Sequence, residues 1–129
     1  MGVSFEKIIV DGTYSRHELA ALWGYASMHA LARGVVTPRD DNKILLFVTE
    51  IKKTHSTQYK DHLSGRTLYW EGPNDHFAEN RMLNASQSGD QIHLFYRHHH
   101  GQGFTYMGPV IVVHHVAKAQ SPSNFVLEI

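Results

Sequence analysis

The chain contains no cysteine, which excludes a disulfide framework, a thiolate nucleophile, cysteine-ligated zinc and iron–sulfur clusters. It also lacks net charge: 12 Lys and Arg balance 12 Asp and Glu, which argues against a broadly polybasic nucleic-acid binder but not against a pocket with local cations. Long apolar runs are missing too, because the longest, Lys43–Ile51 and Pro109–Val113, fall far short of a membrane span. The first residues lack the apolar stretch of a secretory signal. We therefore expect a soluble cytoplasmic protein with no membrane partner.

What the chain does have is an average apolar content and many histidines. Its 129 residues are 42% apolar, which suits one folded domain over 1–129. Eleven residues are histidine, so a modest fall in pH adds several positive charges.

Helical spacing predicts two short helices near the N-terminus. Ser15 and Glu18 form a capping box, and the apolar residues that follow give a helix over Arg16–Trp23. Ser27 caps a second helix over Met28–Arg33. Together, residues 14–37 resemble a helix-turn-helix, in which Ser27, His29 and Arg33 would enter the major groove. We favour the alternative, a helical cap on the rest of the domain.

Strand-forming sequences dominate from residue 43 onward. A short strand is expected over Phe5–Val10, and about six more over Lys43–Glu50, Thr67–Trp70, Ile92–Tyr96, Phe104–Met107, Val110–Val116 and Phe125–Ile129. Lys43–Glu50 is apolar on both faces and is therefore predicted to be a central strand. One further helix is expected near 76–86. This pattern predicts an α+β fold: a small, strongly curved or closed, mostly antiparallel PUA-like β-barrel over 43–129, flanked by the helix pair.

Catalytic signatures are missing from the sequence. It has no Gly-x-Ser-x-Gly elbow, no glycine-rich phosphate loop and no His-Glu-x-x-His pair. The triplet 98–100 is a weak metal motif, because adjacent side chains of an extended chain point to opposite faces. We therefore expect no catalytic residues, no metal and no cofactor. The alternative is a small metal-dependent nuclease or hydrolase that uses His98, His99, His100, Glu71 or Asp75. A third hypothesis is a protein–protein adaptor that uses the strand Val110–Val116.

Aromatic residues gather on or beside the predicted strands. Strand alternation places about half of these rings in the core, and the others are available to stack a planar ligand such as a flipped base. The expected base-binding residues are Tyr59, Trp70, Tyr106, Gln58, Asp61 and Glu71. The expected phosphate-binding residues are Arg97, Arg66, Lys60, Arg33, His98 and His99.

Three longer stretches and one short motif resemble a known family. The stretches are Tyr25–Val48, Thr57–Gly72 and Ile92–Gly108, joined by the motif Pro122–Phe125. They resemble the uncharacterised C-terminal domain of some bacterial helicase–nuclease and HNH-endonuclease fusions. The Phe-x-Tyr-x-Gly pattern that begins at Phe104 also resembles strands of the small barrels that recognise modified bases, the SRA, EVE and YTH domains.

The resemblance implies a target-reading role in restriction or phage defence. We therefore expect a non-catalytic DNA-binding module that recognises modified or flipped bases and is served by a partner nuclease or helicase. Few phosphates are neutralised by a chain without net charge, so a modest salt dependence is expected. The histidines predict a DNA affinity that rises as the pH falls through about 6.5.

Overall fold

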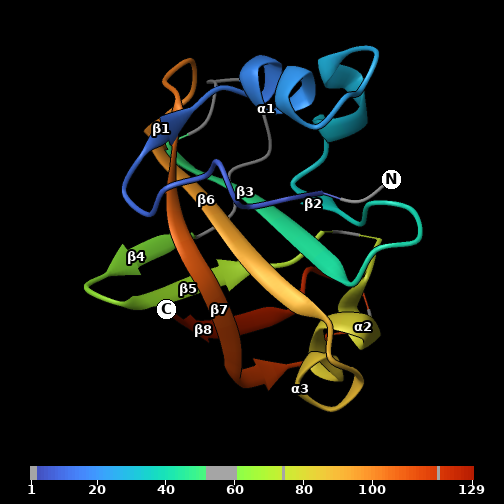
Figure 1. Ribbon diagram of the computed structural model, residues 1–129. Coiled ribbons are helices and arrows are strands. Elements are labelled where there is room, and N and C mark those ends of the chain that lie inside the picture. Colours follow the sequence, from blue (N-terminus) through green and yellow to red (C-terminus); the bar gives the residue numbers. More distant parts are fainter. Residues whose placement is uncertain (1–2, 52–60, 74, 119) are drawn as a thin grey trace.

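The computed structural model describes residues 3–51, 61–73, 75–118 and 120–129. Its elements are β1 (Thr13–Tyr14), α1 (Arg16–Leu22), the 3₁₀ helix η1 (Met28–Leu31), β2 (Val35–Val36), β3 (Lys43–Ile51), β4 (His62–Ser64), β5 (Thr67–Glu71), α2 (Glu79–Leu83), α3 (Ala85–Ser88), β6 (Gln91–His99), β7 (Phe104–Val116) and β8 (Asn124–Glu128). Figure 1 shows α1 at the top of the molecule and α2 and α3 at the bottom. No helix in the described ranges is long and apolar enough to cross a membrane.

Eight strands form one mixed but mostly antiparallel sheet. Their order is β2-β3-β6-β7-β8-β5-β4, and β1 adds to β7. Only β3 and β6 run parallel among the described pairs. Within the described residues β2 and β4 do not pair, so the sheet is open and the closed barrel is not confirmed. The edges are instead only two and three residues long, which limits their unpaired backbone groups.

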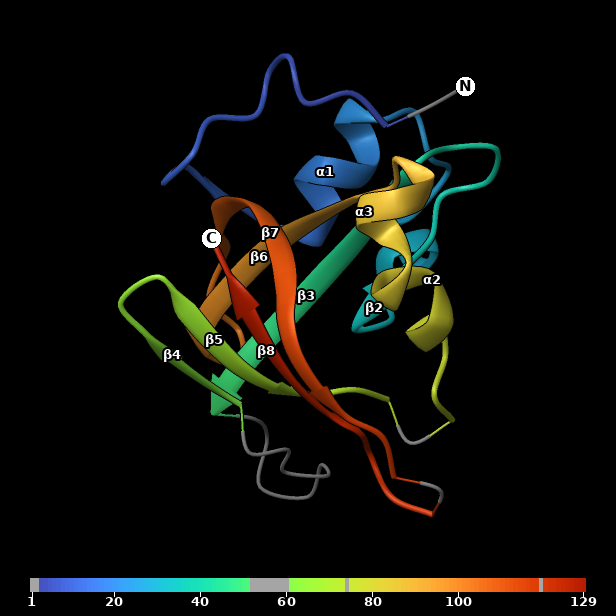
Figure 2. The ribbon, with the colours of Figure 1, turned by 90° about the horizontal axis from the view of Figure 1, so that it is seen from below.

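Strand β7 links the two halves of the sheet. The sequence predicted two strands here, but the structure has one strand of 13 residues. Its residues 105–110 pair with β6, and its residues 111–116 pair with β8. The register shifts between Leu94 and Phe95 and between Val112 and His114 are bulge-like irregularities, which bend strands and increase their twist. Figure 2 shows β7 curving over the other strands as it passes between these partners.

The central strands β3 and β6 are buried on both faces, and this creates two cores. The first core includes Ile44, Leu46, Leu68, Trp70, Met82, Ile92 and Phe125. The second includes Leu19, Trp23, Leu31, Leu45, Phe47, Phe95 and Phe104. Alternation along β3 sends even-numbered residues to the first core and odd-numbered residues to the second. The prediction of a central strand over Lys43–Glu50 is confirmed.

The N-terminal helix pair packs on the second core. In α1, the Glu18 backbone N–H donates to Ser15 Oγ at 3.0 Å, and the Ser15 N–H donates to Glu18 Oε1 at 3.0 Å, so the capping box is present. The second predicted helix is shorter than expected, a single 3₁₀ turn of four residues. So short a turn with Leu31 buried suits a cap better than a recognition helix in a groove.

Two local predictions are wrong. Phe5–Val10 is not a strand; a turn at Asp11, which has a φ of 73°, precedes β1 instead. The helix expected near 76–86 begins later and is split into α2 and α3 at Asn84. Its start is delayed because His76 and Ala78 have left-handed backbone conformations, which interrupt a helix.

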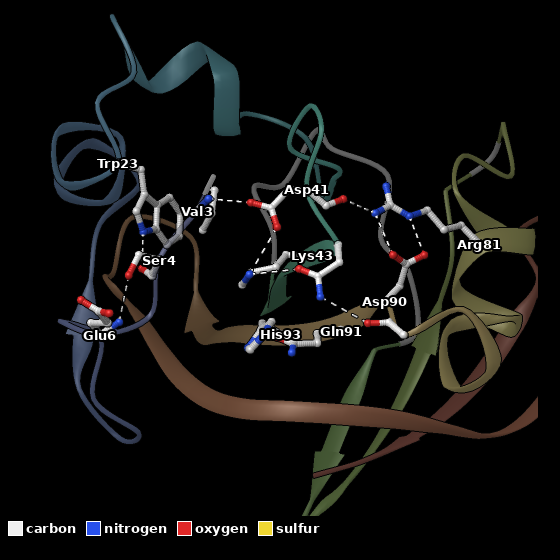
Figure 3. A network of polar contacts seen from close by, with 12 residues as sticks. Val3, Ser4, Glu6, Trp23, Asp41, Lys43, Arg81, Asp90, Gln91 and His93 are labelled. Atoms are coloured by element: carbon white, nitrogen blue, oxygen red, sulfur yellow. Dashed lines mark hydrogen bonds and ion pairs between the residues drawn. The ribbon is translucent and has the colours of Figure 1, made fainter. Parts of the chain in front are cut away.

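A polar network ties the N-terminal segment to the sheet (Figure 3). The carboxylate of Asp41 accepts from Val3 N at 2.6 Å and from Lys43 Nζ at 3.3 Å. The Asp41 carbonyl accepts from Arg81, whose guanidinium also binds Asp90 at 2.9 Å. The connection before β3 is thereby held between the N-terminal segment and α2.

Candidate functional site

A cavity of about 360 Å³ is lined by residues of both cores, Val35 and Trp70 of the first and Phe47 of the second. It is lined by Arg16, Arg33, Gly34, Val35, Phe47, Thr49, Asp61, Trp70, Glu71, Pro73, Arg97 and His100. These residues come from α1, β2, β3, β5, the end of β6 and the connections beside them. The lining therefore combines aromatic rings, guanidinium groups and carboxylates.

One wall is set by the parallel pairing of β3 and β6. Thr49 and Arg97 are register partners, so their side chains lie on the same face of the sheet. Arg97 Nε donates to Thr49 Oγ1 at 2.7 Å, and its Nη1 donates to the Gln102 carbonyl at 3.1 Å. Phe47, two residues before Thr49, shares this face. The register thus fixes a ring, a hydroxyl and a cation side by side.

The opposite wall comes from β5 and the residue before β4. Trp70 is 6% exposed, whereas its neighbour Tyr69 is 48% exposed on the other face of the strand. Asp61 is 7% exposed, and its Oδ1 accepts from the Glu71 backbone N–H at 2.9 Å. A carboxylate is therefore fixed beside an indole ring at the edge of the cavity.

Three arginines line the cavity. Arg33 pairs with Asp75 at 3.0 Å and lies 4.2 Å from the centre of the Phe77 ring. Arg16 packs over the Phe47 ring at 4.8 Å, and burial followed by the nearby charge of Arg97 lowers its pKa to about 10. Arg16 therefore stays charged at neutral pH.

Five of the residues expected from the sequence line this cavity together: Asp61, Trp70, Glu71, Arg33 and Arg97. Gln58, Tyr59 and Lys60 lie outside the described residues. The cavity is therefore a meeting point of base-binding and phosphate-binding candidates that are separated by up to 64 positions in the sequence, from Arg33 to Arg97.

Four other expected site residues lie elsewhere. Tyr106 is 4% exposed in the second core, where its hydroxyl lies 2.7 Å from His93 Nδ1. Arg66 donates to the Ile129 carbonyl at 2.9 Å. His98 and His99 are exposed, and neither lines the cavity. Alternation along β7 sends Tyr106 inward with Phe104, because both occupy the face that packs on the helices.

Sequence reasoning left seven lining residues out of the expected binding site: Arg16, Gly34, Val35, Phe47, Thr49, Pro73 and His100. Phe47 and Thr49 lie in a strand whose sequence is apolar on both faces. The sequence alone therefore does not distinguish them from the core residues of that strand. Alternation from Leu45 was the available signal. The position of Arg16 depends on how α1 packs, and no local pattern gives that.

The side chains of the histidine triplet lie in different surroundings. His98 Nε2 lies 3.4 Å from Glu50, while His100 lines the cavity. In the described part of the chain, no group of three His, Asp or Glu is arranged to hold a metal ion. Asp75, another residue of the nuclease hypothesis, is paired with Arg33.

The sequence matches the family described as "Domain of unknown function (DUF3427)" over residues 8–126. The chain belongs to the DUF3427 family. No curated protein sequence matches it.

Solved structures with a similar fold include DNA-bound proteins. The crystal structure of KRYPTONITE in complex with mCHG DNA and SAH is similar at a TM-score of 0.65 and 13% identity, over 94% of this chain and 32% of that chain. The SUVH5 SRA–methylated CHH DNA complex is similar at a TM-score of 0.58 and 11% identity, over 99% of this chain and 92% of that chain. The DNA modification-dependent restriction endonuclease AspBHI is similar at a TM-score of 0.55 and 14% identity, over 98% of this chain and 79% of that chain.

These similarities show a shared fold. This DUF3427 domain spans about a third of the KRYPTONITE chain but nearly all of the SUVH5 SRA chain. The fold therefore matches the likeness to SRA domains that the strand pattern at Phe104 suggested.

Proposed function

We propose that this DUF3427 domain is a non-catalytic DNA-binding module that takes a modified or flipped base into the cavity at Trp70. The observation that carries the proposal is the buried carboxylate of Asp61 beside the Trp70 ring, on the rim of a cavity that arginines surround. The shared fold adds support, because two similar structures contain methylated DNA.

The size and lining of the cavity suit one nucleobase. Its volume of about 360 Å³ lies near the lower end of the range for small-molecule pockets. Trp70 offers ring surface for a planar ligand, and the Asp61 carboxylate accepts hydrogen bonds. An exocyclic amine such as that of cytosine is a matching donor. Proteins that must reach every edge of a base rotate it out of the base stack. The free energy that this requires is lower where the base pair is already weakened.

The test is a binding series with Asp61→Asn. Fluorescence anisotropy is measured at low salt on duplexes that carry one cytosine, 5-methylcytosine, 5-hydroxymethylcytosine or glucosylated 5-hydroxymethylcytosine. We expect one modified duplex to bind best and Asp61→Asn to weaken that duplex about tenfold or more, since a hydrogen bond to a charged group contributes about 1.5–3 kcal/mol. The asparagine Oδ1 can still accept the hydrogen bond from Glu71 N, and circular dichroism of the variant checks that the fold is kept.

The matched control is Tyr69→Ala, which removes an exposed ring from the other face of the same strand. It should leave the affinity unchanged. A 2-aminopurine placed beside the modified base should brighten on binding if the base leaves the stack. Absence of binding to every duplex at low salt would overturn the proposal, as would equal losses in the two variants.

We further propose that the module directs a partner nuclease or helicase to modified DNA in a cytoplasmic restriction or phage-defence system. The support is the fold it shares with a DNA modification-dependent restriction endonuclease, together with the family resemblance of its motifs. Affinity purification of the protein from its native cells, followed by mass spectrometry, should recover a nuclease or a helicase. Recovery of neither, with the module itself intact, contradicts this context.

A further inference from the structure

Arg16 and Arg97 form a pair of like charges beside the cavity. Their guanidinium carbons lie 4.9 and 4.2 Å from the centre of the same ring, that of Phe104. Burial lowers the pKa of Arg97, and burial with the charge of Arg97 lowers the pKa of Arg16. The two cations therefore repel each other in a partly desolvated place.

Among the described residues, neither arginine of this pair forms an ion pair with a carboxylate. Among the described ion pairs, Arg33 has Asp75 and Arg81 has Asp90, but neither Arg16 nor Arg97 has an acidic partner. Arg16 donates to two backbone carbonyls, those of Leu31 and Arg33. Arg97 likewise donates to the neutral oxygens of Thr49 and Gln102.

These neutral oxygens fix the side chains without removing their charge. A guanidinium carries five N–H donors in a planar fork, so each arginine retains donors for a ligand. Partly buried charges are normally paired, because desolvation is costly. Two guanidinium groups that contact one ring and donate to neutral oxygens are suited to an anion that arrives from outside.

Arg16 and Arg97 also lie between two adjacent pockets. Arg16 and Arg97 line the cavity described above and a second, adjacent pocket of about 180 Å³, which is lined further by Ser15, His17, Met28, Gly101, Gln102 and Phe104. A group of the ligand in the first cavity that extends toward the second pocket meets these two guanidinium groups. In a nucleotide, the group connected to the base through the sugar is a phosphate.

We propose that Arg16 and Arg97 form a subsite for an anionic oxygen group of the bound nucleic acid, either the backbone phosphate next to the inserted base or a carboxylate substituent on that base. As a subsite for DNA it rests on the proposed function, while anion binding by the pair itself does not. Bidentate contact with phosphate or carboxylate is the geometry that arginine favours.

The first experiment uses the full chain without DNA. Arginine Nε–H signals are followed by ¹⁵N NMR while inorganic phosphate replaces chloride at constant ionic strength. We expect saturable shifts of the Arg16 and Arg97 signals, their loss in Arg97→Gln and no saturable shift at Arg66. Arg16→Gln is the second variant if Arg97→Gln does not fold. The absence of any saturable shift overturns the subsite, as does an equal response from Arg66.

The second experiment identifies the source of the anion on the duplex that binds best. A methylphosphonate in place of the phosphate beside the modified base should weaken the wild type about tenfold and have little effect on Arg97→Gln. The slope of log affinity against log salt should fall by about one in Arg97→Gln but not in Arg66→Gln. A preference for 5-carboxylcytosine that Arg97→Gln abolishes identifies the base substituent instead. If neither anion interacts with the arginines, the DNA subsite is refuted.

The two arms separate this proposal from the previous one. Phosphate shifts without binding to any duplex retain the anion site and refute the reader. Selective duplex binding that Asp61→Asn weakens and Arg97→Gln leaves unchanged retains the reader and refutes the subsite.

Discussion

His93 should make the stability of the protein depend on pH. Its ring is buried in β6, with Nδ1 at 2.7 Å from the Tyr106 hydroxyl and Nε2 at 3.0 Å from Gln91 Oε1. Phe5 stacks on the imidazole at 3.9 Å between ring centres. Burial, with a smaller contribution from the charge of Lys43, lowers the pKa of His93 to about 4.

The sign of the effect follows from the two pKa values. In the unfolded chain His93 takes up a proton near its ordinary pKa of about 6.5, whereas in the folded protein it stays neutral down to about 4. The unfolded state therefore binds more protons between these values, and the free energy of unfolding falls as the pH falls through this window. At about 1.4 kcal/mol per pH unit, the loss from pH 6.5 to pH 5 is about 2 kcal/mol.

The assay is urea unfolding at pH 7, 6 and 5, followed by tryptophan fluorescence. Wild type should lose about 2 kcal/mol of unfolding free energy over this range. His93→Gln should be less stable at pH 7, because it loses the stacked ring, but its stability should depend far less on pH. His114→Gln, at an exposed position on β7, is the control and should retain the wild-type dependence. Equal pH dependence in wild type and His93→Gln would refute the reasoning.

Two further predictions concern local contacts, and the midpoint of urea unfolding checks both. Ser15→Ala removes the side-chain half of the capping box with Glu18 and should destabilise the protein by about 1 kcal/mol; an unchanged midpoint would show that α1 does not depend on its cap. Asp41→Ala leaves Val3 N and Lys43 Nζ without their shared acceptor and should cost about 1–3 kcal/mol; a loss below 0.5 kcal/mol would contradict the role assigned to the network, since surface changes away from such contacts stay about within that range.

The sequence predicted those elements whose signals are local. The capping box at Ser15 marks the start of α1, and the continuous apolar run after Lys43 marks a strand buried on both faces. The sequence did not correctly predict whether the sheet closes into a barrel or which strands pair. Nothing in a local pattern states that β7 continues through Gly108 and Pro109 and changes partners, or that β2 and β4 remain unpaired with each other. Those outcomes depend on contacts between distant strands.

The candidate site shows the same division. The alternation of Tyr69 and Trp70 correctly separates an exposed ring from an inward ring, so Trp70 could be proposed from the sequence. Choosing between Trp70 and Tyr106 as a cavity residue required the fold, because both occupy inward positions on different strands. Inward orientation alone does not distinguish a core residue from a residue at the border of a cavity.

The zero net charge of the chain takes on a different meaning once the charges are located. Some of the described cations pair with nearby acids, as Arg81 does with Asp90 and Arg33 with Asp75. Arg16 and Arg97 differ, because their hydrogen bonds end on neutral oxygens. A chain without net charge can therefore still place two guanidinium groups that lack an acidic partner at one cavity, and affinity at a partly desolvated site depends on local and not total charge. The parallel register of β3 and β6, which sets Arg97 beside Thr49, is the feature of the fold that places one of these two groups.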